Sequence, residues 1–276
     1  MEKSIRIGGK LWKWGRRTYI MGILNITPDS FSDGGKFIGL NDALAQAKEM
    51  VEDGADIIDI GGESTRPGAE PVDYAQEIVR IIPVIKALKQ EFDIPISVDT
   101  YRASTAYAAL SAGADMVNDV WGLKNDPDMA KVIAEHGVPV CIMHNSHTAE
   151  YKSLIEDVLT GLGQSIEIAL KSGIKEENII IDPGIGFGKT PDQNLDIMIA
   201  LDRIKNLGYP ILLGTSRKSF IGKVLGLPVE DRLEGTLATS VFGVTKGVDV
   251  LRVHDVRQNK RAAIMTDRMV RGEWTE

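Results

Sequence analysis

The sequence alternates between short apolar runs, polar loops and amphipathic segments about eight times from residue 19 onward. The apolar runs are rich in Ile and Val without regular polar alternation, which is typical of strands buried on both faces of a parallel sheet. Each run is followed by a stretch with helical periodicity. Such regular strand-helix units in a chain of 276 residues predict a single-domain (β/α)₈ barrel, the TIM barrel architecture.

The predicted strands lie at 19–24, 57–60, 94–98, 116–117, 138–143, 179–181, 211–213 and 250–251. The predicted helices cover 40–52, 73–90, 103–112, 127–136, 154–171, 194–206, 231–246 and 256–271. Residues 1–18 predict a β-hairpin that covers the barrel floor, and no linker divides residues 19–276, which we expect to form the barrel. An open doubly wound sheet is the alternative, but the first strand lacks the glycine fingerprint of a dinucleotide fold.

The composition restricts the partners and the location of the protein. The formal net charge of −7 opposes general binding to nucleic acid or to anionic membranes. The N-terminus has no apolar signal core, and no apolar run is long enough to cross a bilayer. The single cysteine, Cys141, lies in an apolar run and is expected to be a buried structural thiol. Because no internal disulfide can form, we expect a cytoplasmic protein.

All strands of such a barrel end at one opening, which is where the chemistry of these folds is located. Every predicted strand carries polar or glycine-rich residues at that end. In chain order these are Asn25, the segment 61–63, Asp99, Asn118 with Asp119, Met143 with His144, Asp182, the segment 214–218, and Arg252 with His254. The sequence therefore predicts one polar site at the barrel mouth.

One group at this mouth consists of Asp99, Asn118 and Asp182. Carboxylates at the ends of buried strands need hydrogen-bond donors from a neighbour or a ligand. Two carboxylates and an amide together suit a flat heterocycle that has an amino group beside a ring N–H. Each of these residues alone would more simply be a capping or turn residue.

A second group is cationic and suits phosphate, since Arg binds phosphate oxygens in a bidentate manner. Its members are Arg66, Arg217, Lys218, Arg252 and His254, with the hydroxyl of Ser216. The alternative is a salt bridge between one of these cations and an acidic residue of the first group. Asn25 and Asp33 add oxygens that could hold Mg²⁺ together with phosphate.

The segment 182–189, with the sequence DPGIGFGK, follows the sixth predicted strand. It does not have the spacing of a Walker loop, and we expect it to bring backbone close to a flat ring, with Phe187 as an apolar wall. His144 and His147 lack further ligands, so we expect roles other than metal binding. The residues alone predict a barrel enzyme for a planar heterocycle beside a di- or triphosphate with Mg²⁺.

The sequence resembles dihydropteroate synthases over nearly its whole length. The segments that carry the resemblance are MGILNITPDSFSDGG, GGESTRPGAEPV, SVDTYRAS, NDVWG, MHN, DPGIGFGKT, GTSRKSFIG and RVHDV, in this order. The resemblance implies an SN1-like condensation of 6-hydroxymethyl-7,8-dihydropterin pyrophosphate with p-aminobenzoate, which gives 7,8-dihydropteroate and pyrophosphate. Ile26, where many relatives have Val, is a conservative difference.

The resemblance also implies roles for individual residues. The pterin would be bound by Asp99, Asn118, Asp182, Lys218, Met143, Phe187 and Arg252. Pyrophosphate would be bound by Asn25, Arg66, Arg252 and His254, with Mg²⁺ on Asn25, and p-aminobenzoate by Phe31, Thr65, Pro67, Lys218 and Ser219. The catalytic residues would be Lys218, Arg252, Asp33 and Arg66. A homodimer through the later helices is implied, where Gly235, Ala238, Thr239 and Gly243 form a small-residue face that intrachain packing explains equally well.

Two other functions compete with this interpretation. A methyltetrahydrofolate:corrinoid methyltransferase domain would have a similar fold and similar pterin-binding residues. It has no pyrophosphate to bind, so the cationic group would be unexplained. A non-catalytic pterin-binding relative could lose Asn25, Arg66 or His254 without penalty, yet all three are present.

Overall fold

A barrel of parallel strands forms the centre of the computed structural model, which describes residues 3–26, 36–63 and 73–272. Within these ranges the sheet has eight strands in the order β8-β7-β6-β5-β4-β3-β10-β9. The strands are β3 (Tyr19–Asn25), β4 (Ile57–Gly61), β5 (Ile96–Asp99), β6 (Met116–Asp119), β7 (Val140–Met143), β8 (Ile179–Asp182), β9 (Leu212–Leu213) and β10 (Val250–Val253). A parallel bridge between Ile181 and Ile211 joins the two outer strands and closes the barrel.

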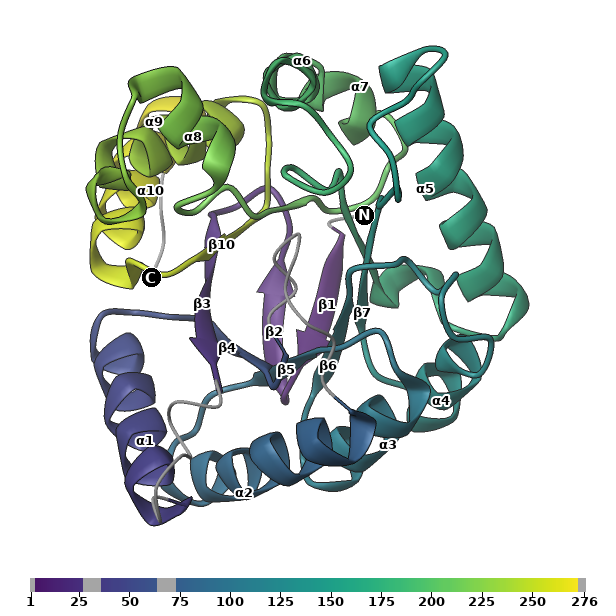
Figure 1. The fold of residues 1–276 in the computed structure, drawn as a ribbon, viewed down its shortest axis with the longest axis vertical. Coiled ribbons are helices and arrows are strands. Elements are labelled where there is room, and N and C mark those ends of the chain that lie inside the picture. Colours follow the sequence, from purple (N-terminus) through teal and green to yellow (C-terminus); the bar gives the residue numbers. More distant parts are fainter. Residues whose placement is uncertain (1–2, 27–35, 64–72, 273–276) are drawn as a thin grey trace.

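Helices surround this barrel on the outside (Figure 1). They are α1 (Lys36–Glu52), α2 (Tyr74–Glu91), α3 (Ala103–Ser111), α4 (Met129–His136), α5 (Leu154–Lys171), α6 (Pro191–Ile199), α7 (Leu201–Lys205), α8 (Ser219–Leu225), α9 (Leu233–Thr245) and α10 (Val256–Val270). Short 3-10 turns, η2 (Glu176–Asn178) and η3 (Val229–Asp231), precede β8 and α9. The larger core cluster packs outward-facing Ile, Val and Leu of the strands against the helices, and this burial supplies the main driving force for folding.

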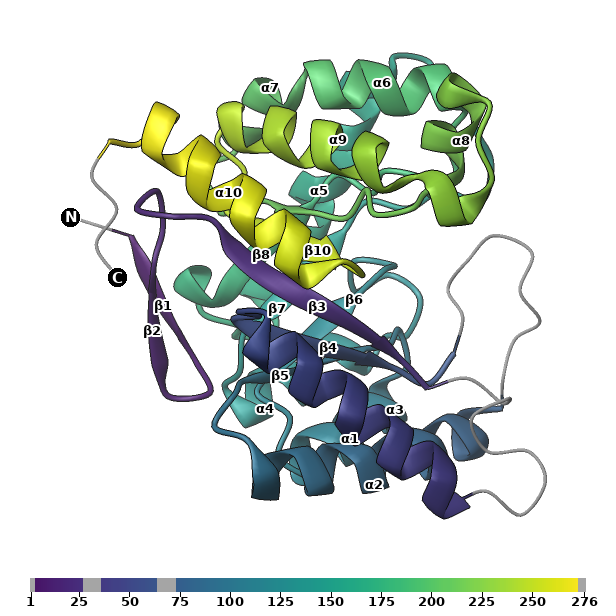
Figure 2. The same ribbon diagram turned by 90° about the vertical axis from the view of Figure 1, so that its left-hand side faces the viewer.

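The N-terminal hairpin consists of β1 (Ser4–Ile7) and β2 (Lys10–Lys13), paired antiparallel. Its two-residue turn is formed by Gly8 and Gly9, with φ values of 56° and 78° that favour glycine. The hairpin lies at the end of the barrel where the strands begin, opposite the ends of β3 and β4 (Figure 2). Ile5, Ile7 and Trp12 pack there against the apolar lower interior of the barrel.

The structure differs from the predicted elements mainly around the sixth and seventh strands. A single helix was expected at 194–206, but α6 begins at Pro191 and α7 follows it. Thr190 and Gln193 form a capping box, and Pro191 at the first helical position fits this start. The helix α8, which follows β9 after the segment 214–218, was not predicted at all. No helix in the described ranges is both long and apolar enough to span a bilayer.

Candidate active site

The barrel interior changes from apolar near the hairpin to polar near the strand ends. Because side chains alternate along a strand, every second residue of each strand faces inward. The lower inward-facing residues are Tyr19, Met21, Ile57, Met116, Cys141, Ile180, Leu212 and Val250. The inward-facing residues nearer the strand ends are polar instead. They are Asp59, Asp99, Asn118 and Asp182, which are buried, and Arg252, which is half-buried. In the sheet register Asp99 pairs with Asn118 and Gly61, and Gly61 pairs with Asn25, whereas Asp59 pairs with Ser97, two residues before Asp99.

The guanidinium of Arg252 is the central cation of this mouth. Its Nε donates to Asp59 Oδ2 at 2.6 Å, and a terminal nitrogen donates to Asp99 Oδ2 at 2.7 Å. The carboxylates are almost completely buried, with 0% and 3% of their side chains exposed. Although burial lowers the pKa of Arg252, Asp59 and Asp99 raise it above its ordinary value, so the group stays charged. The sequence analysis gave a salt bridge to an acidic residue as the alternative to phosphate binding for these cations. Arg252 forms such salt bridges, with Asp59 and Asp99.

Asp59 is part of this site and was not identified from the sequence. Besides the bond from Arg252, its Oδ2 accepts a hydrogen bond from Asn118 Nδ2 at 3.0 Å, so it orients both side chains. The sequence did contain a signal for Asp59, because it is a carboxylate inside the apolar run Ile57–Gly61. A buried carboxylate needs a partner, and the apolar side of the strand that faces the helices offers none, so Asp59 should face the barrel interior.

Three buried oxygens at this level have no hydrogen-bond partner in the described structure: Asp59 Oδ1, Asp99 Oδ1 and Ser97 Oγ. Burial raises the pKa of Asp99 to about 7, opposed by Arg252 and reinforced by Asp59. Burial dominates, and the nearby Asp59 carboxylate offsets part of the stabilisation that Arg252 gives. Asp99 therefore keeps an acceptor atom available for a ligand with hydrogen-bond donors.

Asp182 and Lys218 form the opposite side of the mouth. Asp182 Oδ1 accepts a hydrogen bond from Gly184 N at 2.7 Å. Lys218 Nζ donates to Ile185 O and lies 4.6 Å from the centre of the Phe187 ring. Burial lowers the pKa of Lys218 to about 8, although Asp182 raises it. Burial also raises the pKa of Asp182, which Lys218 opposes.

Lys218 and Arg252 flank one backbone position at the end of β9. A Cβ added to Gly214 would lie 3.9 Å from both Lys218 Nζ and Arg252 Cβ. On the other side of the mouth, a Cβ added to Gly61 would lie 3.6 Å from Asn25 Oδ1 and 3.7 Å from Asp99 Cβ. Glycine at these two positions leaves the space between the polar side chains open.

Not every predicted cation joins this group. Arg217 has a positive φ of 57° and pairs through its guanidinium with Asp255, its Nε lying 3.0 Å from Asp255 Oδ2. His254 Nδ1 lies 2.9 Å from Ser216 Oγ, and His254 N donates to the same hydroxyl at 3.1 Å. Ser216 therefore orients His254, whereas Arg217 is engaged by Asp255 at the start of α10.

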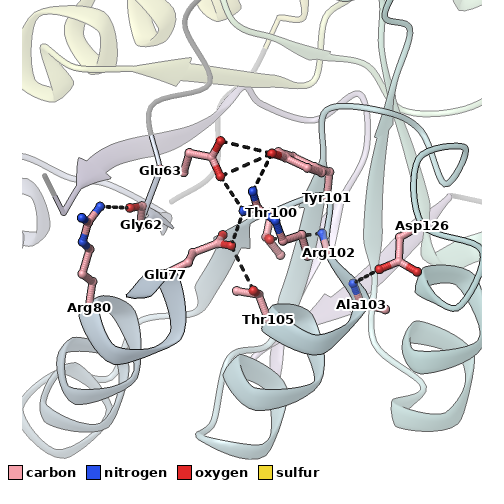
Figure 3. A network of polar contacts seen from close by, with 10 residues as sticks. All are labelled: Gly62, Glu63, Glu77, Arg80, Thr100, Tyr101, Arg102, Ala103, Thr105 and Asp126. Carbon is pink, nitrogen blue, oxygen red and sulfur yellow. Dashed lines mark hydrogen bonds and ion pairs between the residues drawn. The ribbon is translucent and has the colours of Figure 1, made fainter. Parts of the chain in front are cut away.

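A second polar network joins the loops after β4 and β5 (Figure 3). One terminal nitrogen of Arg102 contacts Glu63 Oε2 and, at 2.7 Å, Glu77 Oε2. Its other terminal nitrogen donates to Tyr101 Oη at 2.8 Å, and Tyr101 Oη contacts Glu63 Oε1 at 3.1 Å. Thr105 Oγ1 donates to Glu77 Oε2 at 3.0 Å. This network, which sequence reasoning did not find, ties the end of β4 to the starts of α2 and α3.

The comparisons with known proteins agree on one family. A family model described as "Pterin binding enzyme" matches residues 21–254. A dihydropteroate synthase of Clostridium beijerinckii is 60% identical over 268 residues, which cover 97% of this chain and 100% of that protein. The chain belongs to the dihydropteroate synthase family.

Solved structures of dihydropteroate synthases have the same fold. The enzyme of Clostridium difficile, in the presence of pteroic acid, has a TM-score of 0.92 and 57% identity, and the match covers 94% of this chain and 99% of that chain. The enzyme of Xanthomonas albilineans with 4-aminobenzoic acid has a TM-score of 0.92 and 38% identity, with 98% of both chains covered. The barrel and the family resemblance predicted from the sequence are thus confirmed.

The remaining residues predicted from the dihydropteroate synthase motifs lie around the described mouth or outside the described ranges. Met143 is buried at the end of β7, Phe187 is half-buried, and Ser219 is exposed at the first position of α8. Asn25 is exposed at the end of β3. The predictions for Phe31, Asp33, Thr65, Arg66 and Pro67 fall outside the described residues.

Proposed function

We propose that the polar mouth of this barrel carries out the dihydropteroate synthase reaction. In this reaction 6-hydroxymethyl-7,8-dihydropterin pyrophosphate and p-aminobenzoate give 7,8-dihydropteroate and pyrophosphate, which makes the chain a transferase. The observation that carries the proposal is the convergence of Asp99, Asn118, Asp182, Lys218 and Arg252 at one end of the barrel. Acceptors for a donor-rich ring and cations for an anionic leaving group thus lie side by side.

The pterin ring would lie between the acidic and the apolar residues of the mouth. Asp182 and the unpaired Oδ1 of Asp99 are suited to accept hydrogen bonds from its amino and ring N–H groups. Asn118, held by Asp59, can both donate and accept. Met143, Phe187 and the stem of Arg252 are the candidates for contact with the ring faces.

The reaction needs a stabilised leaving group more than it needs a nucleophile on the protein. The bond between the pterin methylene carbon and the pyrophosphate oxygen breaks, and its electron pair leaves with pyrophosphate. The amine of p-aminobenzoate then forms the new C–N bond and loses a proton to solvent. Arg252, His254 and Arg66 would stabilise the departing anion, while Asp99 and Asp182 would stabilise the cationic pterin. The catalytic roles of Asp33 and Arg66 stay predictions, because both residues lie outside the described ranges.

Mg²⁺ is part of the proposal because it binds oxygen ligands and is usually held with substrate phosphates. The residues present fit such a shared site, since the amide oxygen of Asn25 lies at the mouth near Asp99. No cluster of three or more His, Cys, Asp or Glu side chains in the described ranges would hold a metal by itself. When bound, Mg²⁺ would neutralise charge on the pyrophosphate.

The second substrate is proposed to lie over Lys218 and the first turn of α8. Ser219 is exposed there and follows Lys218 directly, so both can face the same ligand. Phe31, Thr65 and Pro67 complete the proposed p-aminobenzoate pocket by resemblance. Lys218 would then contact both substrates.

We also propose a cytoplasmic homodimer. Support comes from exposed apolar side chains on α6, α8 and α9, namely Ile199, Val224, Leu225 and Phe242. Of the small residues of α9, Gly235 and Gly243 pack inward, because a Cβ on Gly235 would lie 2.3 Å from Ile221 and one on Gly243 would lie 2.4 Å from Leu213, whereas Ala238 is exposed. Sedimentation analysis tests the dimer, and a monomer at micromolar concentration would contradict it.

The test of the proposed function is incubation of the purified protein with both substrates and Mg²⁺. We expect dihydropteroate and pyrophosphate in equal amounts. Transfer of a methyl group from methyltetrahydrofolate would instead identify a corrinoid methyltransferase domain. Pterin binding without product would identify a non-catalytic relative.

A further inference from the structure

The loop between β8 and α6 carries several of the groups used in the proposed function. It supplies the Phe187 ring, the carbonyl of Ile185 that binds Lys218, and the Gly184 amide that binds Asp182. The position of this loop therefore controls the position of the pterin-binding groups. The contacts that hold the loop in place therefore bear on pterin binding, provided that the proposed function is the function of this site.

The ammonium of Lys189 lies inside the turn made by this loop. It donates to Gly184 O and to Phe187 O, both at 2.9 Å. It also lies 3.1 Å from His144 Nδ1 and 3.4 Å from His144 O, which belong to the loop after β7. Its contacts therefore join both ends of the glycine-rich turn to the neighbouring loop.

The environment of His144 favours a neutral ring whose Nδ1 accepts a hydrogen bond from this ammonium. Its side chain is buried, and burial with the nearby charges of Lys189 and Lys124 lowers its pKa to about 3, so the ring stays neutral. Gly161 of α5 makes room for the ring, because a Cβ at that position would lie 2.6 Å from His144 Cδ2. A neutral ring can accept a hydrogen bond at Nδ1 while it keeps its proton on Nε2.

The backbone of the loop is pressed against the neighbouring loop. Gly184 has a φ of 73°, and a Cβ there would lie 1.8 Å from His144 O. Gly188 has a φ of 57°, and a Cβ there would lie 2.2 Å from Ser146 O. The two loops are thus in close backbone contact at two positions, and at the first of them the Lys189 ammonium donates to carbonyls of both loops, Gly184 O and His144 O. Burial lowers the pKa of Lys189 to about 7, and the charge of Lys218 acts in the same direction while Asp182 opposes it. The four atoms within hydrogen-bond distance are acceptors, which favours the ammonium form.

We propose that Lys189 is a positioning residue of the pterin site, which acts through His144 and the carbonyls of the 184–188 loop to hold Phe187, Asp182 and Lys218 in their binding arrangement. Lys189 itself would not touch the substrate. Removal of its ammonium leaves buried carbonyl oxygens that face one another without a donor, and the loop must move to reach solvent or other donors. The effect should therefore appear in pterin affinity more than in the chemical step.

The first test compares Lys189→Met with Lys124→Met. Lys124 is a matched control, because its partly buried ammonium lies near His144 but donates to Gly161 O at 2.7 Å and not to the loop. For Lys189→Met we expect the KM for the dihydropterin pyrophosphate to rise about tenfold, as for the loss of one buried charge-assisted contact. For Lys124→Met we expect less than about a twofold change. Equal effects of the two variants would overturn the proposal.

The second test separates positioning from general stability by chemical rescue. Lys189→Ala leaves room for a small cation among the same oxygen and nitrogen acceptors. Ammonium or methylammonium chloride at about 0.1 M should recover at least about half of the lost pterin affinity, while tetramethylammonium and sodium chloride at the same ionic strength should not. Recovery by all salts alike, or by none, would mean that Lys189 contributes only to folding and would overturn the proposal.

Direct binding measurements keep this test distinct from the test of the proposed function. Calorimetric titration with a dihydropterin reports affinity whether or not the protein turns substrates over. If wild type binds the pterin but makes no product, the function fails and the comparison of Lys189 variants still decides the positioning role. If wild type binds no pterin, both proposals fail.

Discussion

The two ends of this barrel use the same strands in opposite ways. At the floor, Trp12 stacks on Tyr19 with ring centres 4.1 Å apart, and the Tyr19 hydroxyl accepts a hydrogen bond from Lys13 N at 2.7 Å. At the mouth, Asp59, Ser97 and Asp99 each keep a buried oxygen without a partner in the described structure. The Tyr19 hydroxyl at the floor is satisfied, and Asp249 Oδ1, just before β10, is the one buried carboxylate oxygen without a partner at that end of the described structure. The mouth instead gathers three unpartnered acceptors that a ligand could use.

This difference shows how one architecture separates stability from binding. Burial of apolar surface at the floor stabilises the fold, while buried charges at the mouth contribute little net stability or oppose it. Such unsatisfied groups are tolerated where they serve a ligand. Substitutions at the mouth should therefore change function, with a loss of stability where a buried ion pair is broken, and substitutions at the floor should change only stability. The following predictions test that separation.

Arg252→Gln should have the largest effect. The substitution leaves Asp59 and Asp99 as buried carboxylates without their cation, so the free energy of unfolding should fall by about 3–5 kcal/mol. The kcat/KM should fall at least about 100-fold, because a cation for the leaving group is lost. Urea unfolding and steady-state kinetics measure the two effects. Arg217→Gln, which removes the more exposed pair with Asp255, is the control and should cost less than about 1 kcal/mol.

Trp12→Ala should affect stability alone. Loss of this buried ring from the floor should lower the free energy of unfolding by about 3 kcal/mol or more, measured by denaturant titration. The kcat/KM of the folded protein should stay within about twofold of wild type. The control is Leu11→Ala, since Leu11 is 48% exposed on the same strand. A large change in kcat/KM for Trp12→Ala would show that floor and mouth are coupled.

Asp182→Asn should have an intermediate effect that is confined to the mouth. An amide keeps one acceptor but places a donor where a pterin N–H would point, so pterin affinity should fall by about 1–3 kcal/mol. Isothermal titration calorimetry with a dihydropterin measures this loss. Asp196→Asn, an exposed position on α6, should leave the affinity unchanged. Unchanged affinity in Asp182→Asn would remove Asp182 from the pterin site.

The pH dependence of pterin affinity should give the smallest effect. Asp99, with a pKa raised to about 7 by burial, must lose its proton to accept from the ligand, so affinity should rise as pH increases through 7. Lys218, with a pKa lowered to about 8 by burial, must keep its proton, so affinity should fall as pH increases through 8. We expect a maximum between these values and a few-fold loss at either side. Asp99→Asn should flatten the acid limb, and an unchanged acid limb would contradict this assignment.

The sequence predicted the fold well because its signals are local and repeated. The helix α5 has the predicted bounds, and α10 begins at the predicted residue, because amphipathic periodicity is strong there. The helix α8 was missed, since the segment after β9 was interpreted as a binding loop and seven residues give little periodicity. The division of 191–205 into α6 and α7 was also missed, although Thr190, Pro191 and Gln193 form a recognisable start signal.

The site was predicted less completely, because side-chain pairs depend on which strands become neighbours. Residues at strand ends were found from the rule that all strands share one mouth. Asp59 was overlooked because it lies before the strand end, and its importance follows from contacts with Arg252, 193 positions away. Arg102 was overlooked for the same reason, since Glu63 and Glu77 reach it only in the folded barrel.

The single bridge between Ile181 and Ile211 makes the seam between β8 and β9 the thinnest part of the described barrel wall. Its amide hydrogens should exchange with solvent sooner than those of β3 and β4, which pair over five residues. Asp182 and Gly214 continue the two strands on either side of this seam. A ligand that contacts both Asp182 and Gly214 would stabilise the pairing of β8 with β9. Ligand binding at the mouth should therefore slow amide hydrogen exchange in these two strands.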